Sequence, residues 1–270
     1  MNWATVFSAA RDCLAACDVD DKLQLTATAA TAWRDGTLAT TTDDKPDPIG
    51  EPGRPQRPEL VMPASVPRRG LGTPAGRAAL VHALAHIEFN AINLAWDAVY
   101  RFRGMPPAFY GDWIRVADEE AYHFRLLRGR LREMEHEYGD FPAHNGLWDM
   151  ACKTAFDPMV RMALVPRVME ARGLDVTPGM IKRLRHIGDH HTVEILEIIL
   201  RDEVGHVAIG SHWFGYECEK RGLNAQSTFR QLISQYMAGE LRGPFDYDSR
   251  LQAGFTEDEL RALERLSASP

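Results

Sequence analysis

Helical periodicity, interrupted by Pro and Gly, limits the fold of this chain more than any other feature. Four long segments carry apolar residues at every third or fourth position, and no segment shows convincing alternation of period two. The segments expected to be helical are about 74–103, 112–138, 145–172 and 190–220. Four long helices predict an all-α protein built as a four-helix bundle.

Breaks are expected inside the third and fourth segments. Pro158 and Pro166 should kink or break the third helix, and Gly173 should end it. Pro178 should then start a new helix, which is interrupted near Gly188 before it resumes to about residue 220.

The remaining segments are expected to lie around the bundle. Residues 2–34 read as two helices joined near the sequence DVDD, and residues 43–75 are crowded with Pro and Gly, which predicts an extended connection on the surface. Weaker helical patterns follow at 225–241 and 257–266. We predict three parts: N-terminal helices and extended connection packed on the bundle (1–75), a bundle with one crossover connection (76–222) and a C-terminal helical tail (223–270).

Composition excludes several classes of protein. The chain has 270 residues, 45% of them hydrophobic, and a formal net charge of -7, so it can bury a large core and shows no basic footprint for nucleic acid. No apolar run approaches the ~18 residues of a membrane span, and the start MNWATVFSAARDC lacks the pattern of a secretion signal. Four cysteines form no C-x-x-C pair. We therefore expect a cytoplasmic protein without membrane association.

The sequence LRDEVGH, residues 200–206, places a carboxylate and an imidazole three positions apart. At ~100° per residue, Glu203 and His206 fall inside the apolar stripe that contains Leu196 and Ile199. An ionised carboxylate buried without a partner is costly. This position therefore argues against a solvated surface pair and favours a site.

The same pattern occurs in EEAYH, where Glu120 and His123 again lie in an apolar stripe. A third copy, Glu133-Met-Glu-His136, lies on the polar side of the same helix, roughly 140° from Glu120, and serves as an internal control. The direction of the side chains, and not the bare spacing, separates the two candidate copies from the surface copy.

The other two long helices each place one glutamate in an apolar stripe. Glu88 is flanked by apolar residues of the first helix, and Glu170 is expected to share a face with Phe156 and Ala163 of the third. The interval from Glu88 to Glu120 is 32 residues and that from Glu170 to Glu203 is 33, which indicates two similar helical hairpins. The 50 residues between Glu120 and Glu170 suit a crossover.

Ferritin-like di-iron or di-manganese carboxylate proteins have this ligand set on four helices: a Glu, a Glu-x-x-His, a Glu and a second Glu-x-x-His. Two divalent ions need oxygen ligands to neutralise their charge, and two imidazoles suit iron. A lone buried Glu or His is more often part of a polar network, but the shared phase and the duplicated spacing favour a dinuclear site. We predict two iron ions, with manganese or a mixed pair as alternatives. The predicted ligands are Glu88, Glu120, His123, Glu170, Glu203 and His206, with Glu120 and Glu203 bridging the two ions.

Other polar residues receive weaker expectations. Two histidines of the first helix should point away from its apolar stripe, toward the surface or behind a ligand: His82 and His86. Three carboxylates could orient a ligand imidazole or lie on the surface: Asp118, Glu119 and Asp202. Two rings could line the site or pack in the core: Tyr122 and Trp213. Four histidines should lie away from any metal: His136, His190, His191 and His212.

The segments AHIEFNAINLAWDAVYRF, DWIRVADEEAYHFRLLRGRL, ALVPRVMEARGLDVTP and ILRDEVGHVAIG together resemble a bacterial ferritin-like family, catalogued as a domain of unknown function. That family is distantly similar to the tRNA-modifying di-iron hydroxylases. The resemblance covers about residues 70–255 and implies a ferritin-like fold and ligand roles for the six residues above. It implies no substrate.

Three functions remain open at this point. The first is an O2-activating oxygenase or hydroxylase, whose partners would be O2, an unidentified small-molecule substrate and an electron-donor protein. The second is a ferroxidase or peroxide-consuming iron protein, and the third is a metal-binding interaction protein without enzyme activity. The distant resemblance favours a tRNA substrate, but the net acidity of the chain argues against it.

Overall fold

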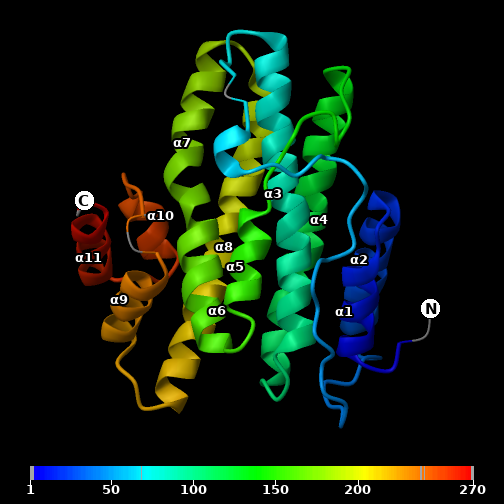
Figure 1. The fold of residues 1–270 in the computed structure, drawn as a ribbon, viewed down its shortest axis with the longest axis vertical. Coiled ribbons are helices and arrows are strands. Elements are labelled where there is room, and N and C mark those ends of the chain that lie inside the picture. Colours follow the sequence, from blue (N-terminus) through cyan, green and yellow to red (C-terminus); the bar gives the residue numbers. More distant parts are fainter. Residues whose placement is uncertain (1–2, 68, 238, 240, 269–270) are drawn as a thin grey trace. The chain divides into compact units, whose positions relative to one another are not determined.

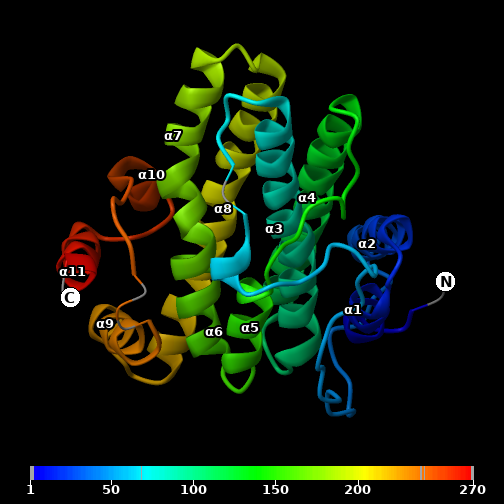
Figure 2. The same cartoon turned by 45° about the horizontal axis from the view of Figure 1, so that its top comes forward.

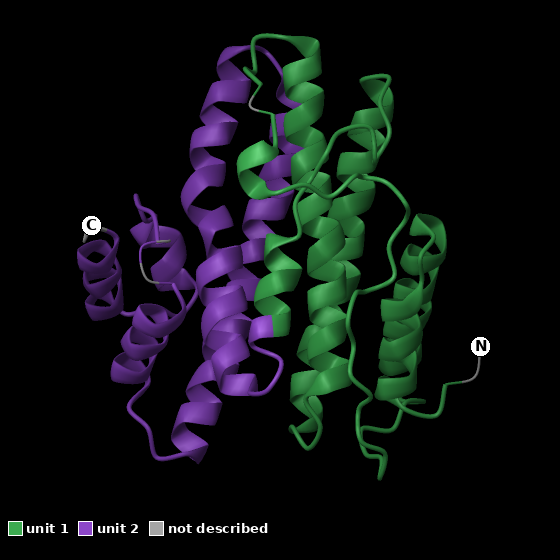
Figure 3. Ribbon diagram, in the orientation of Figure 1, with its two compact units in different colours: residues 1–152 green, residues 153–270 purple. Residues whose placement is uncertain are grey.

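The computed structural model describes residues 3–67, 69–237, 239 and 241–268. Within these ranges all regular secondary structure is helical, apart from two isolated bridges, Thr5–Ala39 and Leu60–Ala143. The predicted all-α class is therefore confirmed. The chain divides into two compact units, residues 1–152 and 153–270 (Figure 3). The three-part organisation expected from the sequence stays a prediction.

Unit 1 is built around two long helices that pack against each other, α3 and α4 (Figures 1 and 2). Helix α1 contacts α3, and α2 contacts α4. The helices of this unit are α1 (Val6–Ala15), α2 (Val19–Arg34), the short 3-10 helix η1 (Pro63–Ser65), α3 (Pro74–Arg101), α4 (Pro107–Glu133) and α5 (Gly146–Lys153).

Local signals explain the ends of α3 and α4. The Thr73 hydroxyl accepts a hydrogen bond from the Gly76 N–H at 3.0 Å, and Pro74 opens α3 where its missing N–H costs nothing. Helix α4 also opens with a proline, Pro107, five residues before the predicted start. It ends at Glu133 and not near residue 138, because Glu135 adopts a φ of 61° that no helix continues through.

Helix α3 is buried on every side over residues 88–100. His82 and His86 do not lie at the surface, because their exposed fractions are 1% and 8%. The alternative expectation, a place behind a ligand, stays a prediction. His82 accepts a hydrogen bond from the Gly139 N–H, and His86 lies 2.9 Å from the Tyr138 hydroxyl. The face of α3 behind Glu88 is thus covered by other parts of unit 1.

The connection between α2 and α3 is mostly exposed, as predicted, but it is tied down at points. Pro52 and Pro58 are buried, and the Gly53 N–H donates to the Leu14 carbonyl at 2.7 Å. A Cβ atom at Gly53 would lie 2.3 Å from the Ala15 carbonyl oxygen, so only glycine allows this approach.

Unit 2 is organised around α8, which contacts the helical segment that precedes it and two of the C-terminal helices. Its elements are α6 (Pro158–Leu164), the π-helix η2 (Val165–Glu170), α7 (Ala171–His186), α8 (His190–Lys220), α9 (Ala225–Tyr236), α10 (Tyr247–Gln252) and α11 (Glu257–Ala268). The predicted range 190–220 for α8 is confirmed. Gly188, with φ of 78°, ends α7, and the Asp189 carboxylate caps α8.

The third predicted helix, about 145–172, is broken near Pro158 as predicted, and Pro166 lies in the π-helix η2. The chain breaks after α5, restarts at Pro158 with an Asp157 cap, and passes through η2 into α7. Gly173 does not end the helix, and Pro178 lies inside α7 and does not start a new one. The packing of buried residues such as Leu174 and Leu184 keeps α7 helical where local propensity alone would break it.

Buried ion pairs link the C-terminal helices to the rest of unit 2. Arg167 of η2 donates to Glu259 of α11 at 2.8 Å, and Arg250 of α10 donates to Asp175 of α7 at 2.7 Å. Helix α10 itself had no clear sequence signal. No helix among the described residues combines the length and the apolar content that crossing a membrane requires.

Gly210 of α8 generates a prediction about how closely α8 and η2 pack. A Cβ atom built there would lie 2.4 Å from the Cβ and Cγ atoms of Pro166. We expect Gly210→Ala to lower the free energy of unfolding by about 1–3 kcal/mol, the usual cost of an overpacked core. Urea denaturation followed by circular dichroism measures the change.

Gly215 of the same helix provides the matched control, because a Cβ atom there meets nothing within 4 Å. Gly215→Ala should raise the free energy of unfolding by up to about 1 kcal/mol, since alanine favours a helix over glycine. If both variants are stabilised, α8 and η2 do not approach each other as described.

Candidate metal centre

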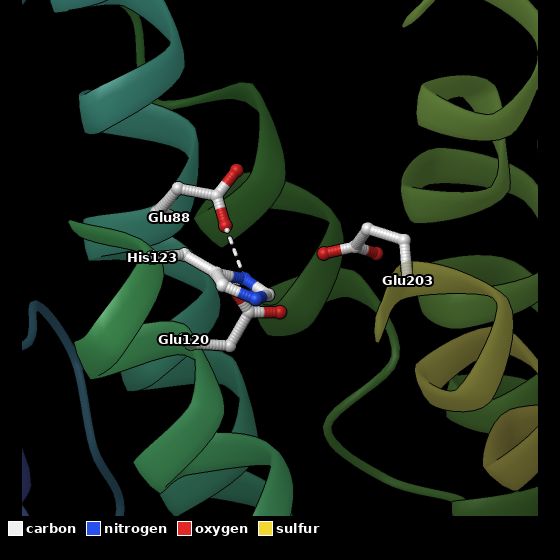
Figure 4. Close-up of side chains that lie close together, drawn as sticks. All are labelled: Glu88, Glu120, His123 and Glu203. Atoms are coloured by element: carbon white, nitrogen blue, oxygen red, sulfur yellow. Dashed lines mark hydrogen bonds and ion pairs between the residues drawn. The ribbon is translucent and has the colours of Figure 1, made fainter. Parts of the chain in front are cut away.

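Three of the predicted ligands come together inside unit 1. Glu88 of α3 and Glu120 and His123 of α4 each offer a ligand atom, and these atoms lie within 4.8 Å of one another (Figure 4). The exposed fractions of the three residues are 4%, 1% and 0%. Figure 4 also draws Glu203, which belongs to unit 2. The three unit 1 residues are called the α3–α4 cluster below.

The packing of α3 on α4 places this cluster. Glu120 and His123 are three residues apart on a helix, so both side chains leave the same face of α4. Ala117 and Ala121, which are fully buried beside them, leave space for the larger polar groups. Glu88 completes the cluster from α3, in the middle of the stretch that is buried on every side.

Hydrogen bonds and charge tie the three groups to one another. The Nδ1 atom of His123 lies 3.2 Å from Oε2 of Glu88 and 3.5 Å from Oε2 of Glu120. Burial alone would lower the pKa of His123, but the hydrogen bonds and negative charges of Glu120 and Glu88 outweigh burial and raise it to about 11. The imidazole is therefore held as a cation beside the carboxylates.

The pKa of Glu88 is raised as well, but here burial is the main cause. Burial, and next the charge of Glu120, raise the pKa of Glu88 to about 8, although His123 opposes this. The cluster therefore binds protons tightly at neutral pH in place of a cation. Two buried carboxylates with one imidazole offer oxygen and nitrogen donors that suit a divalent ion such as iron or manganese. The α3–α4 cluster can hold a metal ion.

Unit 2 carries the second Glu-x-x-His. Glu203 and His206 lie one turn apart on α8, with His206 Nδ1 3.4 Å from Glu203 Oε1. Their exposed fractions are 9% and 1%, so both are buried as the apolar stripe predicted. The pair repeats the arrangement of Glu120 and His123 on α4.

Glu170 departs from its predicted setting. It is half-buried and ends η2, the π-helical turn that contacts α8. Its expected neighbour Phe156 is 67% exposed, because the chain breaks between α5 and α6 and a single helical phase does not extend across the break. The π turn changes the direction in which side chains leave the helix, and such turns occur often at functional sites.

The weaker expectations have mixed outcomes. Asp118 pairs with Arg34 of α2 at 3.1 Å and Asp202 bonds its neighbour Arg201 at 2.9 Å, so both have partners at the surface. Tyr122 is 42% exposed, whereas Trp213 is buried. For Glu119, the predicted orienting role stays a prediction.

The four control histidines lie outside the buried core as predicted, and their distance from any metal stays a prediction. Three are exposed, His190, His191 and His212, and the fourth, His136, is half-buried beyond the end of α4 next to Asp140. The described residues place none of these four in a group of convergent metal ligands. Glu133 pairs with Arg130 at 2.8 Å on the surface of α4.

Buried polar residues behind Glu88 were missed by the sequence reasoning. Lys22 of α2 donates to Asn93 at 2.7 Å, and Asn90 donates to the backbone carbonyl of His86 at 2.8 Å. All four residues are buried. The sequence did contain one signal: residues 88–100 include few charged residues, and the helix has no polar face there. Such a helix is expected to be buried on all sides.

Comparison with known proteins identifies the family. The family model described as "Protein of unknown function (DUF455)" matches residues 15–261. An "Uncharacterized protein" of Haemophilus influenzae (strain ATCC 51907 / DSM 11121 / KW20 / Rd) is 50% identical over 213 residues, which cover 76% of this chain and 74% of the relative. No solved structure matches. The chain belongs to the DUF455 family.

The shifted pKa values predict that metal binding to the α3–α4 cluster releases protons. At pH 6.5 a metal displaces a proton from both Glu88 and His123, about two per ion, and above pH 8 only the His123 proton remains to be released. Calorimetric titration with Mn(II) in buffers of different ionisation enthalpy measures this number. Metal affinity should therefore rise with pH between about 6 and 9.

The stability of the metal-free protein should change in the opposite direction. Glu88 and His123 both have folded pKa values above their ordinary values of 4.5 and 6.5, so the folded state binds protons more tightly than the unfolded state. Their contribution is complete below pH 4.5 and is lost as pH rises through about 8 for Glu88 and about 11 for His123. A proton release of zero, or an affinity that is independent of pH, would contradict this electrostatic account.

Proposed function

We propose that this chain is a non-haem dinuclear iron carboxylate protein that uses O2 to oxidise an organic substrate. The observation that carries the proposal is the α3–α4 cluster, where two glutamates and a histidine converge in the interior of unit 1. Buried carboxylates repel each other and are costly unless a cation or protons neutralise them. A divalent ion would provide that neutralisation.

The second half of the proposed centre is Glu170, Glu203 and His206 of unit 2. The support is the repeated pattern: each unit has a glutamate on one helical segment and a buried Glu-x-x-His on a later helix, at intervals of 32 and 33 residues. In each unit the two segments contact each other, α3 with α4 and η2 with α8, although in unit 2 helix α7 lies between the two segments in the sequence. We propose that the two hairpins form one ferritin-like four-helix bundle with a crossover between them.

Each side chain would have a defined task in this centre. Glu88 with His123 would hold one ion, and Glu170 with His206 the other. Glu120 and Glu203 would bridge the two ions, which would keep the ions at a fixed separation. Iron suits this donor set, with manganese or a mixed pair as the alternative.

Two iron ions, when bound, supply the electrons for O2-dependent oxidation. The residues of the chain would supply the setting: Glu88 and His123 would release protons when the ions bind, and an apolar surround would exclude water. The proposed partners are O2, a small organic substrate and an electron-donor protein, and the proposed location is the cytoplasm. The distant similarity to tRNA-modifying di-iron hydroxylases belongs to this proposal, while the net charge of -7 disfavours tRNA itself.

The proposal predicts graded loss of metal from ligand variants. Glu120→Ala and Glu203→Ala should each lose both ions, because each residue bridges. His123→Ala and His206→Ala should each retain about one ion per chain, since each histidine binds one ion. Metal analysis of protein produced with ample iron, together with melting curves with and without Fe(II), measures the loss.

Glu133→Gln is the matched control, because Glu133 belongs to the surface Glu-x-x-His of the same helix α4. It should retain both ions and the full metal-dependent rise in melting temperature. If Fe(II) and Mn(II) leave the wild-type melting temperature unchanged, the six residues form a polar network and not a metal site.

Oxygen uptake separates the proposed oxygenase from a ferroxidase. With excess Fe(II) and no organic substrate, O2 uptake by the proposed enzyme should stop once the bound iron is oxidised. Continued uptake with growth of a mineral core would instead indicate that iron is the substrate. An oxygen electrode and absorbance of ferric mineral follow the two outcomes.

A further inference from the structure

Unit 1 contains a cavity of about 280 Å³ that the metal centre does not use. The start of α1, the connection after α2 and the C-terminal end of α3 line this cavity. Fifteen residues separate Glu88 from Arg103, which lines the cavity, or about 20 Å at the helical rise of ~1.5 Å per residue. The cavity is therefore a separate place in the fold.

Arg103 is the unusual residue of this cavity. Its guanidinium lies 3.7 Å from the centre of the Phe7 ring and 5.0 Å from that of Tyr100. Its Nε and Nη1 atoms are buried, and they have no hydrogen-bond partner in the part of the chain that the structure describes. A buried donor of this kind is destabilising unless a partner satisfies it.

Two buried arginines of unit 2 differ from Arg103 because each has a carboxylate partner. Arg167 has Glu259 as its partner at 2.8 Å, and Arg250 has Asp175 at 2.7 Å. In both cases a carboxylate of the chain neutralises the buried guanidinium. The aromatic rings under Arg103 stabilise its charge by cation–π contact but accept no hydrogen bonds in its plane.

Two further cations line the same cavity. Lys45 is exposed. Nε of Arg11 lies 3.7 Å from Oδ1 of Asp12, and an exposed ion pair at this distance contributes little to stability. The carboxylates of Asp44 and Asp47 also line the cavity. Three cations thus face two carboxylates, and the cavity has an excess of positive charge.

Hydroxyl groups also line the cavity, and each donates a hydrogen bond within the chain. Thr5, Ser8 and Thr42 all line the cavity, the first two from the start of α1. A guanidinium with a neighbouring lysine matches the acceptor geometry of a phosphate or carboxylate group. The cavity volume suits such a group on a small molecule and not a macromolecule.

We propose that this cavity binds a small anion through a phosphate or carboxylate group that pairs with Arg103, and that Arg11 and Lys45 add to the attraction. The anion gives the guanidinium of Arg103 an acceptor that it lacks among the described residues. The site acts independently of the metal centre and does not depend on the proposed oxygenase activity.

Calorimetric titration of the full chain with inorganic phosphate in ~100 mM NaCl tests the proposal, with succinate as the carboxylate probe. Saturable binding of either probe is the expected result, and the tighter of the two identifies the chemical class. Arg103→Met keeps an apolar stem over Phe7 but removes the guanidinium, so it should weaken binding at least about tenfold. Arg34→Met, at an exposed arginine of α2 outside the cavity, should leave binding unchanged.

A second variant keeps the test valid if Arg103→Met fails to fold. The double variant Arg11→Met with Lys45→Met changes side chains that lie at the surface, and it should weaken phosphate binding at least about threefold. The proposal is overturned if neither probe binds saturably, or if the cavity variants that fold bind as tightly as wild type.

Discussion

The burial of Glu88, Glu120 and His123 between α3 and α4 is the constraint on which the rest of unit 1 depends. These groups have exposed fractions of at most 4%, and the carboxylates raise the pKa of His123 to about 11. Such a cluster stays in place only if the two helices are held firmly. Helix α1 packs on α3 and α2 packs on α4, so the N-terminal helices hold the outer faces of this pair. The complete burial of α3 over residues 88–100 follows from the same need.

Unit 2 also buries a Glu-x-x-His pair, but one of its helical segments has a different backbone geometry. The pair Glu203 and His206 on α8 repeats Glu120 and His123, but the partner segment contains a π turn that ends at Glu170. Pro166 is the second residue of that turn, and Gly210 lets α8 approach it, because any larger residue would meet the proline ring. A π turn costs hydrogen-bond quality, and its place at a proposed ligand is consistent with a functional reason for the distortion.

The sequence predicted the helices with strong local signals. Helix α8 and the start of α3 match their predicted bounds because Asp189, Thr73 and Pro74 act locally. Long-range packing decided the rest. Pro178 sits inside α7 because the packing of that helix in unit 2 outweighs its local cost.

The candidate site was predictable to the same degree. The phase of Glu120, His123, Glu203 and His206 correctly placed these side chains in buried stripes, since each lies within one unbroken helix. The prediction for Glu170 held only in part: its Oε2 atom is buried, but its expected neighbour Phe156 is exposed, because a chain break and a π turn separate the two residues. The surface position considered for His82 and His86 was wrong because a single stripe cannot reveal that a second layer covers the other side of α3.

The central claim is that the two Glu-x-x-His helices contribute to one centre with two ions. Electron paramagnetic resonance of the protein loaded with Mn(II), at a measured metal content, tests this most directly. The account predicts two ions per chain and a spectrum that shows magnetic coupling between them, since bridging carboxylates hold the ions a few ångströms apart. Two uncoupled ions, or saturation at one ion per chain, would contradict it.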